Sequence, residues 1–107
     1  MTQQTNHSSD NKSALTPSLM AQPLTLPCGV SLKNRIAKSA MSENMAPDHQ
    51  ANAQFVKTYE TWAQGGCGLL ISGNVMVDSR HLGEPDNIII EKGQEGLENL
   101  KKWTQAG

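Results

Sequence analysis

The sequence carries almost no net charge and no long hydrophobic run. Its nine Lys and Arg residues nearly balance ten Asp and Glu residues, which leaves a formal charge of −1. A balanced chain lacks the basic surface with which proteins bind nucleic acid or anionic membranes. The apolar stretches fall far short of the ~20 residues that span a bilayer, and the N-terminus lacks the basic start and apolar core of a secretory signal. We therefore expect a soluble, cytoplasmic protein with no nucleic-acid and no membrane partner.

Cysteine and histidine are also scarce, and they form no recognisable chemical motif. Cys28 and Cys67 lie far apart without metal-ligand spacing, so we predict two small buried hydrophobic residues and no metal site. His49 and His81 are isolated, and no Ser-His-Asp arrangement can be read locally. The glycines of GGCG, residues 65–68, follow a predicted helix and precede a predicted strand, which is the reverse of a dinucleotide-binding loop. Motifs therefore identify no catalytic residue.

The start of the chain differs from the rest in composition. Residues 1–18, MTQQTNHSSDNKSALTPS, are rich in Ser, Thr, Asn and Gln and cannot bury enough apolar area to offset the entropy of ordering. We predict a disordered polar leader over residues 1–18 and a folded portion over residues 19–107.

The folded portion begins with the pattern of a hairpin and a strand. Leu24 and Leu26 alternate with polar residues, Pro27-Cys28-Gly29 supplies a turn, and the alternation resumes at Val30 and Leu32, as is typical of a short β-hairpin. Residues 35–41, RIAKSAM, then predict a strand whose candidate buried residues are Ile36 and Ala37.

A helix, a second strand and a second helix follow. Asn52 and Gly65 are the predicted caps of the first helix, and its core face consists of Phe55, Val56, Tyr59, Trp62 and Ala63. The continuous apolar run CGLLISGN, residues 67–74, predicts a strand buried on both faces. A loop is expected next, and then an amphipathic helix over residues 95–107, with Leu97, Leu100 and Trp103 on one face and Glu98 paired with Lys102.

This order of elements predicts an α/β fold that is incomplete by itself. A strand, a helix and a doubly buried strand indicate a βαβ crossover with parallel strands. Two parallel strands leave both edges of the sheet unpaired, and a complete (βα)8 barrel needs roughly 250 residues. We therefore expect a truncated chain, the first part of a larger α/β domain.

The ends of the two predicted strands are the candidate binding site. In parallel α/β folds, ligands bind at the carboxyl ends of strands. Small side chains, one hydroxyl and one amide gather there, and they suit a flat polar heterocycle better than a metal or a phosphate. Small residues at a strand end can equally be packing solutions. The candidate residues are Ser39, Ala40, Met41, Ser42, Gly73 and Asn74.

A charged loop follows the second strand and has two interpretations. Asp78, Arg80, His81 and Glu84 could line the mouth of a site, or could form a local salt-bridged loop or a subunit contact. Since exposed loop charges contribute little energy, we favour the structural interpretation.

Three blocks in order resemble the start of the Old Yellow Enzyme family of NADH:flavin oxidoreductases. They are the hairpin followed by LKNRI, the block WAQGGCGLLISGN, and the loop VDSRHLGEP. The resemblance covers about residue 20 to the C-terminus. It implies an FMN-binding TIM (β/α)8 barrel, of which this chain would be the basal β-hairpin and the first two βα units.

The resemblance also implies roles for the candidate residues. The segment Ser39, Ala40, Met41 and Ser42 would pack on the flavin, and Gly73 with Asn74 would present backbone to it. The family often has Pro at the position of Ala40, and Thr or Cys at the position of Ser42, where a Ser hydroxyl could make a similar hydrogen bond. Asn44 stands where some relatives have a substrate-contacting Tyr, so that contact does not carry over as such.

Two hypotheses of function follow. The first is an FMN-dependent oxidoreductase that passes hydride from NADH or NADPH to a small-molecule acceptor such as an activated alkene, with these 107 residues inactive on their own. The alternative is a non-catalytic interaction or assembly module that recruits a partner through an open sheet edge. The oligomeric state stays open.

Overall fold

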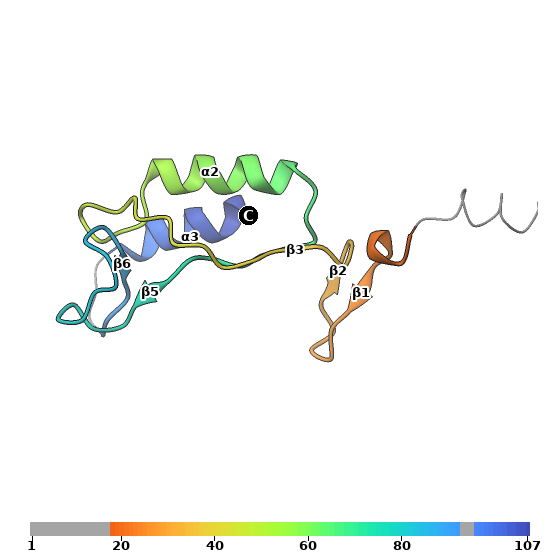
Figure 1. The fold of residues 1–107 in the computed structure, drawn as a ribbon, viewed down its shortest axis with the longest axis horizontal. Coiled ribbons are helices and arrows are strands. Elements are labelled where there is room, and N and C mark those ends of the chain that lie inside the picture. The colour runs from red at the N-terminus through yellow and green to blue at the C-terminus, as the bar shows by residue number, and fades with distance from the viewer. Residues whose placement is uncertain (1–17, 93–95) are drawn as a thin grey trace, which may run out of the picture. The chain divides into compact units, whose positions relative to one another are not determined.

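The computed structural model describes residues 18–92 and 96–107, which form two units (Figure 1). One unit ends at Ile36 and the other extends from Ala37 to Gly107. Apart from Ser18, the predicted leader lies outside the described residues, so its disorder stays a prediction. The Ser18 carbonyl accepts a hydrogen bond from the Ala21 N–H at 3.0 Å, in a short 3-10 helix, η1 (Leu19–Ala21).

The first unit contains the predicted hairpin. Strands β1 (Leu24–Thr25) and β2 (Ser31–Leu32) pair antiparallel, with Leu24 opposite Leu32. The turn closes through the Gly29 N–H, which donates to the Leu26 carbonyl at 2.8 Å. Gly29 has a φ of 93°, a conformation that residues with a Cβ rarely adopt. The turn chemistry read from the sequence is therefore confirmed.

The second unit contains the predicted strand–helix–strand crossover. Strand β3 (Ala37–Lys38) pairs in parallel with β4 (Leu69–Leu70), and helix α2 (Ala53–Gln64) lies between them in the chain. The Asn52 side chain accepts hydrogen bonds from the first free N–H groups of α2, and the Gly65 N–H donates to carbonyls of the last turn. Both predicted caps are thus confirmed, because each satisfies backbone groups that the helix leaves unpaired.

Aromatic packing between α2 and α3 (Leu97–Ala106) forms the centre of the core. The two helices lie side by side (Figure 1). The Trp103 ring meets Phe55 at 5.3 Å and Tyr59 at 5.4 Å between centroids, both edge to face, the arrangement that aromatic quadrupoles favour. Phe55 is 1% exposed, and burial of such a side chain stabilises a fold by about 1.5–3 kcal/mol.

The structure places two further strands where the sequence predicted a loop. Strand β5 (Val75–Met76) pairs in parallel with β6 (Ile88–Ile89), and both isoleucines are buried. The Ile89 N–H also donates to the His49 carbonyl at 3.0 Å. The loop prediction was wrong because the pairing joins residues that are distant in sequence, and two-residue strands leave little periodicity to read.

The predicted burial of Ile36 and Ala37 is wrong, and the predicted burial of the β4 run is wrong on one face. Ile36, the last residue of the first unit, and Ala37 are exposed; Leu69 and Ile71 are also exposed, whereas Leu70 packs against the core. Successive strand residues point to opposite faces. In the described part of the second unit the helical core covers the Leu70 face and leaves Leu69 and Ile71 open, so the continuous apolar run does not report burial on both faces here.

Two side-chain predictions in α3 and one in the hairpin are also corrected. Leu97 is exposed, since it lies in the first turn of α3, away from the core. Glu98 pairs with Lys101 at 3.2 Å rather than with Lys102; both spacings lie on one helix face. Cys28 is exposed at the hairpin turn, and Cys67 is half-buried.

The described residues form a mixed α/β structure of three separate strand pairs, without a closed barrel. Among them, no helix has the length and apolarity to cross a membrane. No group of His, Cys, Asp and Glu side chains within residues 18–92 and 96–107 could hold a metal ion.

Candidate functional site

The ends of β3 and β4 meet at Gly73. Gly73 is buried, and a Cβ added to it would collide with the Met41 carbonyl oxygen and the Glu43 carboxylate. Only glycine lets the two backbones approach this closely. The structure therefore brings the segment 39–42 and the pair Gly73-Asn74 to the same edge.

The Glu43 carboxylate connects this edge to helix α2. Its Oε2 atom accepts a hydrogen bond from the Gly73 N–H at 3.0 Å and another from the Tyr59 hydroxyl. The sequence prediction missed Glu43, although an acidic residue two positions after the predicted strand 35–41, with a Tyr on the core face of the next helix, was a readable signal. One half-buried carboxylate thus joins the ends of both strands to the core.

The environment of Tyr59 keeps its phenol protonated. Burial is the largest cause that raises the pKa of Tyr59, and the hydrogen bond and negative charge of Glu43 raise it further. Lys38 packs on the aromatic rings of α2, with its Nζ 4.8 Å from the Trp62 ring centroid and 5.8 Å from that of Tyr59. Its Nζ also donates to the Ser39 carbonyl at 2.7 Å. Lys38 and Glu43 therefore flank the 39–42 segment, and each contacts an aromatic side chain of α2.

The segment 39–42 presents small and flexible side chains to the outside. Ser39, Ala40, Met41 and Ser42 are all exposed. The Ser42 hydroxyl donates to a Glu84 carboxylate oxygen, so the hydroxyl that the resemblance implies for a flavin has a partner in this structure. Met41 offers an apolar, adaptable surface.

Asn74 takes part in a network behind the edge. Its Nδ2 lies 3.4 Å from Oδ1 of Asn87, which is a weak hydrogen bond. Asn87 is 2% exposed, and its Oδ1 also accepts from the Glu84 N–H at 2.6 Å. The amide of Asn74 is thus turned toward the 84–87 loop.

Asn44 anchors a loop. It has a φ of 49°, and Asn tolerates this left-handed conformation better than most residues. Its Oδ1 accepts a hydrogen bond from the Asp86 N–H at 3.0 Å. The side chain that the resemblance placed near substrate is therefore engaged with the neighbouring loop.

The residues of the charged loop support different interpretations. Arg80 forms a salt bridge with Asp78 at 2.8 Å. The side-chain hydrogen bonds between these two residues are the main cause that lowers the pKa of Asp78 and raises the pKa of Arg80. These two residues and the exposed His81 support the local structural interpretation. Glu84 instead contacts Ser42, at the candidate site.

The Ser42 hydroxyl, the Asn74 amide and the Gly73 N–H already have protein partners, so the surface open to a ligand is the exposed segment 39–41 with its apolar Met41. Such a surface of small and apolar groups suits contact with a flat uncharged heterocycle. The isoalloxazine ring of FMN is such a heterocycle. The tight meeting of backbone at Gly73 supplies a smooth wall, since no side chain projects from it.

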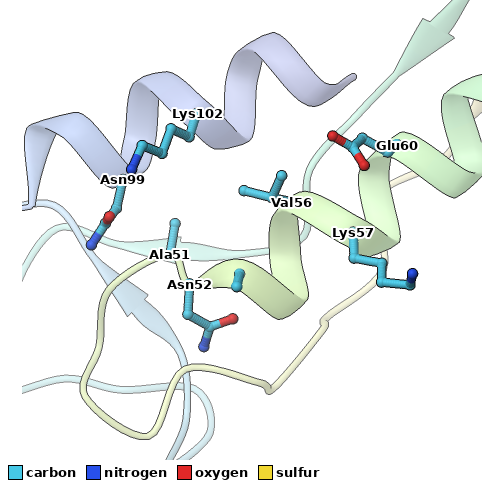
Figure 2. Close-up of a pocket in the computed structure, with 8 residues that line it drawn as sticks. Ala51, Asn52, Val56, Lys57, Glu60, Asn99 and Lys102 are labelled. Atoms are coloured by element: carbon cyan, nitrogen blue, oxygen red, sulfur yellow. The ribbon is translucent and has the colours of Figure 1, made fainter.

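A separate groove lies between α2 and α3. It has a volume of about 410 Å³ and includes Lys57 and Glu60 of α2 and Lys102 of α3 (Figure 2). None of its lining residues belongs to the strand-end set. We therefore treat the strand-end edge as the candidate site.

Comparison with known proteins gives relatives of one kind. No protein-family model matches the chain. The NADH-dependent flavin oxidoreductase iccE of Talaromyces variabilis is 45% identical over 65 residues, which cover 60% of this chain and 16% of that protein. The NADH-dependent flavin oxidoreductase iliE of Hypocrea jecorina (strain QM6a) is 34% identical over 84 residues, with coverage of 78% and 21%.

A solved structure agrees with the sequence relatives. The crystal structure of TcOYE with pHBA matches 81% of this chain and 23% of that chain, with a TM-score of 0.68 and 26% sequence identity. The match of the iliE protein of Neonectria sp. (strain DH2) covers 11% of that protein, so this chain spans a small part of its relatives. The chain is thus partly homologous to the NADH-dependent flavin oxidoreductases of the Old Yellow Enzyme family.

Proposed function

We propose that this chain forms part of the flavin-binding edge of an FMN-dependent oxidoreductase of Old Yellow Enzyme type. The observation that carries the proposal is the meeting of segment 39–42 with Gly73, in a chain whose relatives are NADH-dependent flavin oxidoreductases. The (β/α)8 barrel, of which these residues would supply the basal hairpin and the first two βα units, belongs to the same proposal.

Each part of the edge has a task in this proposal. When bound, FMN supplies the hydride chemistry between NADH or NADPH and an activated alkene or similar acceptor. Met41 and Ala40 would contact the ring, and Ser42 would exchange its bond to Glu84 for one to the flavin. Asn74 would present its backbone, and no residue of this set moves a proton to substrate.

Expression of the complete reading frame that encodes this chain tests the proposal. We expect a yellow protein with one FMN per chain, which oxidises NADH or NADPH when an activated alkene is supplied. The visible absorbance of bound flavin and the loss of NADH absorbance are the measurements. A colourless protein without turnover contradicts the proposal.

We further propose that the 107 residues alone have no such activity. They span 11% to 21% of the curated relatives, and the phosphate site of a barrel is built by loops after its last strands. Titration of FMN with the 107-residue chain should leave flavin fluorescence unchanged at micromolar protein. Stoichiometric quenching would contradict this.

The alternative function is assembly through an open edge of the β3–β4 pair. In the described residues this sheet has two strands only, so the outer backbone edges can accept a strand from a partner, and the exposed side chains of Leu69 and Ile71 add apolar surface beside that edge. Size-exclusion chromatography with circular dichroism separates the two proposals. A folded complex of one defined size supports assembly, and heterogeneous aggregates support an incomplete barrel.

A further inference from the structure

We propose that Glu43 is a positioning residue that sets the spacing between the two flavin-facing strand ends. The inference rests on the proposed function. It assigns a role to a side chain that neither the motifs nor the candidate set contained.

Glu43 is the point at which three separate segments converge. The Gly73 N–H, from the end of β4, donates to its Oε2 at 3.0 Å, and the Tyr59 hydroxyl, from α2, donates to the same oxygen. Glu43 itself follows the exposed segment 39–42. Hydrogen bonds to a carboxylate are about twice as strong as neutral ones, so this one oxygen can hold both segments in place.

The bond also changes what Gly73 can offer. Because the Gly73 N–H donates to Glu43, it is not directed at a ligand. Its remaining contribution is steric: the missing Cβ admits the Met41 carbonyl and the Glu43 carboxylate. The cofactor would therefore meet backbone on either side of Gly73, whose place is determined by Glu43.

Burial makes the interaction specific. Tyr59 is 4% exposed, and it packs against Trp62 and Trp103 at 5.0 and 5.4 Å between ring centroids. The ring cannot move without disturbing the core, so its hydroxyl is a fixed donor. The Nζ of Lys38 lies over the Tyr59 and Trp62 rings, so a cation also packs on this cluster.

The test compares variants of the purified flavoprotein that contains this chain. Glu43→Gln keeps the shape and one acceptor oxygen but removes the charge, and Glu43→Ala removes both bonds. Glu60→Gln is the matched control, since Glu60 is an exposed carboxylate on α2, next to Tyr59 in the chain. The readouts are the Kd for FMN of each stripped protein, the visible spectrum of bound flavin and the flavin reduction potential.

We expect the Kd for FMN to rise roughly threefold to tenfold in Glu43→Gln and more than tenfold in Glu43→Ala, with a shifted flavin spectrum and potential. Glu60→Gln should match the wild type in all three. If Glu43→Ala does not fold, the isosteric Glu43→Gln decides the matter.

The outcomes separate the two proposals. A wild-type protein that binds FMN, together with folded Glu43→Gln and Glu43→Ala proteins of unchanged Kd, spectrum and potential, overturns the role of Glu43 alone. A wild-type protein that binds no FMN overturns the proposed function and this inference with it. A higher Kd with an unchanged spectrum and potential also contradicts the inference, because a loss of overall stability would explain it.

Discussion

Gly73 is the residue at which two strand ends come closest. Its importance is steric, since the space that a Cβ would need is filled by the Met41 carbonyl and the Glu43 carboxylate. Backbone atoms cannot move aside as a flexible side chain can, and overpacking of this kind is destabilising. Glu43 and Tyr59 complete the same cluster, so the properties of these three residues are coupled.

Gly73→Ala should lower the free energy of unfolding by about 1–3 kcal/mol, because an added methyl group has to displace backbone. Gly83→Ala is the matched control. A Cβ there would lie 3.1 Å from Asn74 Nδ2 and 3.3 Å from Asn87 Oδ1, which are side-chain atoms, so a smaller loss is expected. Urea unfolding followed by circular dichroism measures both, and equal losses would contradict the steric argument.

From the raised pKa of Tyr59 we predict that the folded state loses stability at alkaline pH. Burial and Glu43 raise its pKa above the ordinary value of 10.0. Below that value both the folded and the unfolded state keep the proton. Above it the unfolded state ionises first, so stability decreases as the pH rises until the folded state also ionises.

The measurement is the unfolding free energy of the wild type and of Tyr59→Phe at pH 8 and pH 11, values chosen on either side of the ordinary tyrosine pKa. All other titratable groups are common to the two proteins, so the difference between the two proteins isolates the phenol. We expect a smaller alkaline loss in Tyr59→Phe. An equal loss would show that the phenol ionises without penalty.

At the scale of elements, α2 is the part that organises the second unit. Asn52 caps its first turn and also donates from Nδ2 to the Met45 carbonyl at 2.9 Å. The cap therefore fixes the helix to the loop that leads away from segment 39–42. Aromatic residues on its inner face then pack with Trp103 of α3. A change at the cap thus acts on the helix and on the loop together.

Asn52→Ala should cost about 1–2 kcal/mol in unfolding free energy, since it removes the acceptor for two helix N–H groups and the bond to Met45. Asn52→Asp keeps the acceptor and loses the donor, so its loss should be smaller. Thermal and urea unfolding of the two variants provide the comparison. If Asn52→Asp were as unstable as Asn52→Ala, the bond to Met45 rather than the cap would be the important contact.

At the scale of the whole molecule, the open strand face is the main feature. Leu69 and Ile71 are 41% and 44% exposed, on residues that alternate with the core-facing Leu70. In the larger domain that we propose, further strands and side chains of a barrel interior would cover this face. In the 107-residue chain they remain open to solvent.

The 107-residue chain should therefore self-associate at micromolar concentration. Leu69→Lys together with Ile71→Lys should reduce this association, because charges on an exposed strand oppose edge pairing. Analytical ultracentrifugation measures the change, and Val30→Lys with Leu97→Lys, two other exposed apolar positions, is the matched control. An equal effect of the control pair would show that general solubility, not the strand face, is responsible.

Local signals in the sequence determined the hairpin turn at Gly29, the cap of α2 at Asn52 and the order of strand, helix and strand. The turn and the cap each depend on residues a few positions apart, so local backbone chemistry specifies them, and the order of elements follows from the hydrophobic pattern within each segment. The tertiary structure decided the rest. The β5–β6 pair, the bond from Tyr59 to Glu43 and the exposure of Leu69 and Ile71 all depend on which distant segments pack together. A hydrophobic residue shows that burial is favourable; only the fold shows whether a covering surface is there.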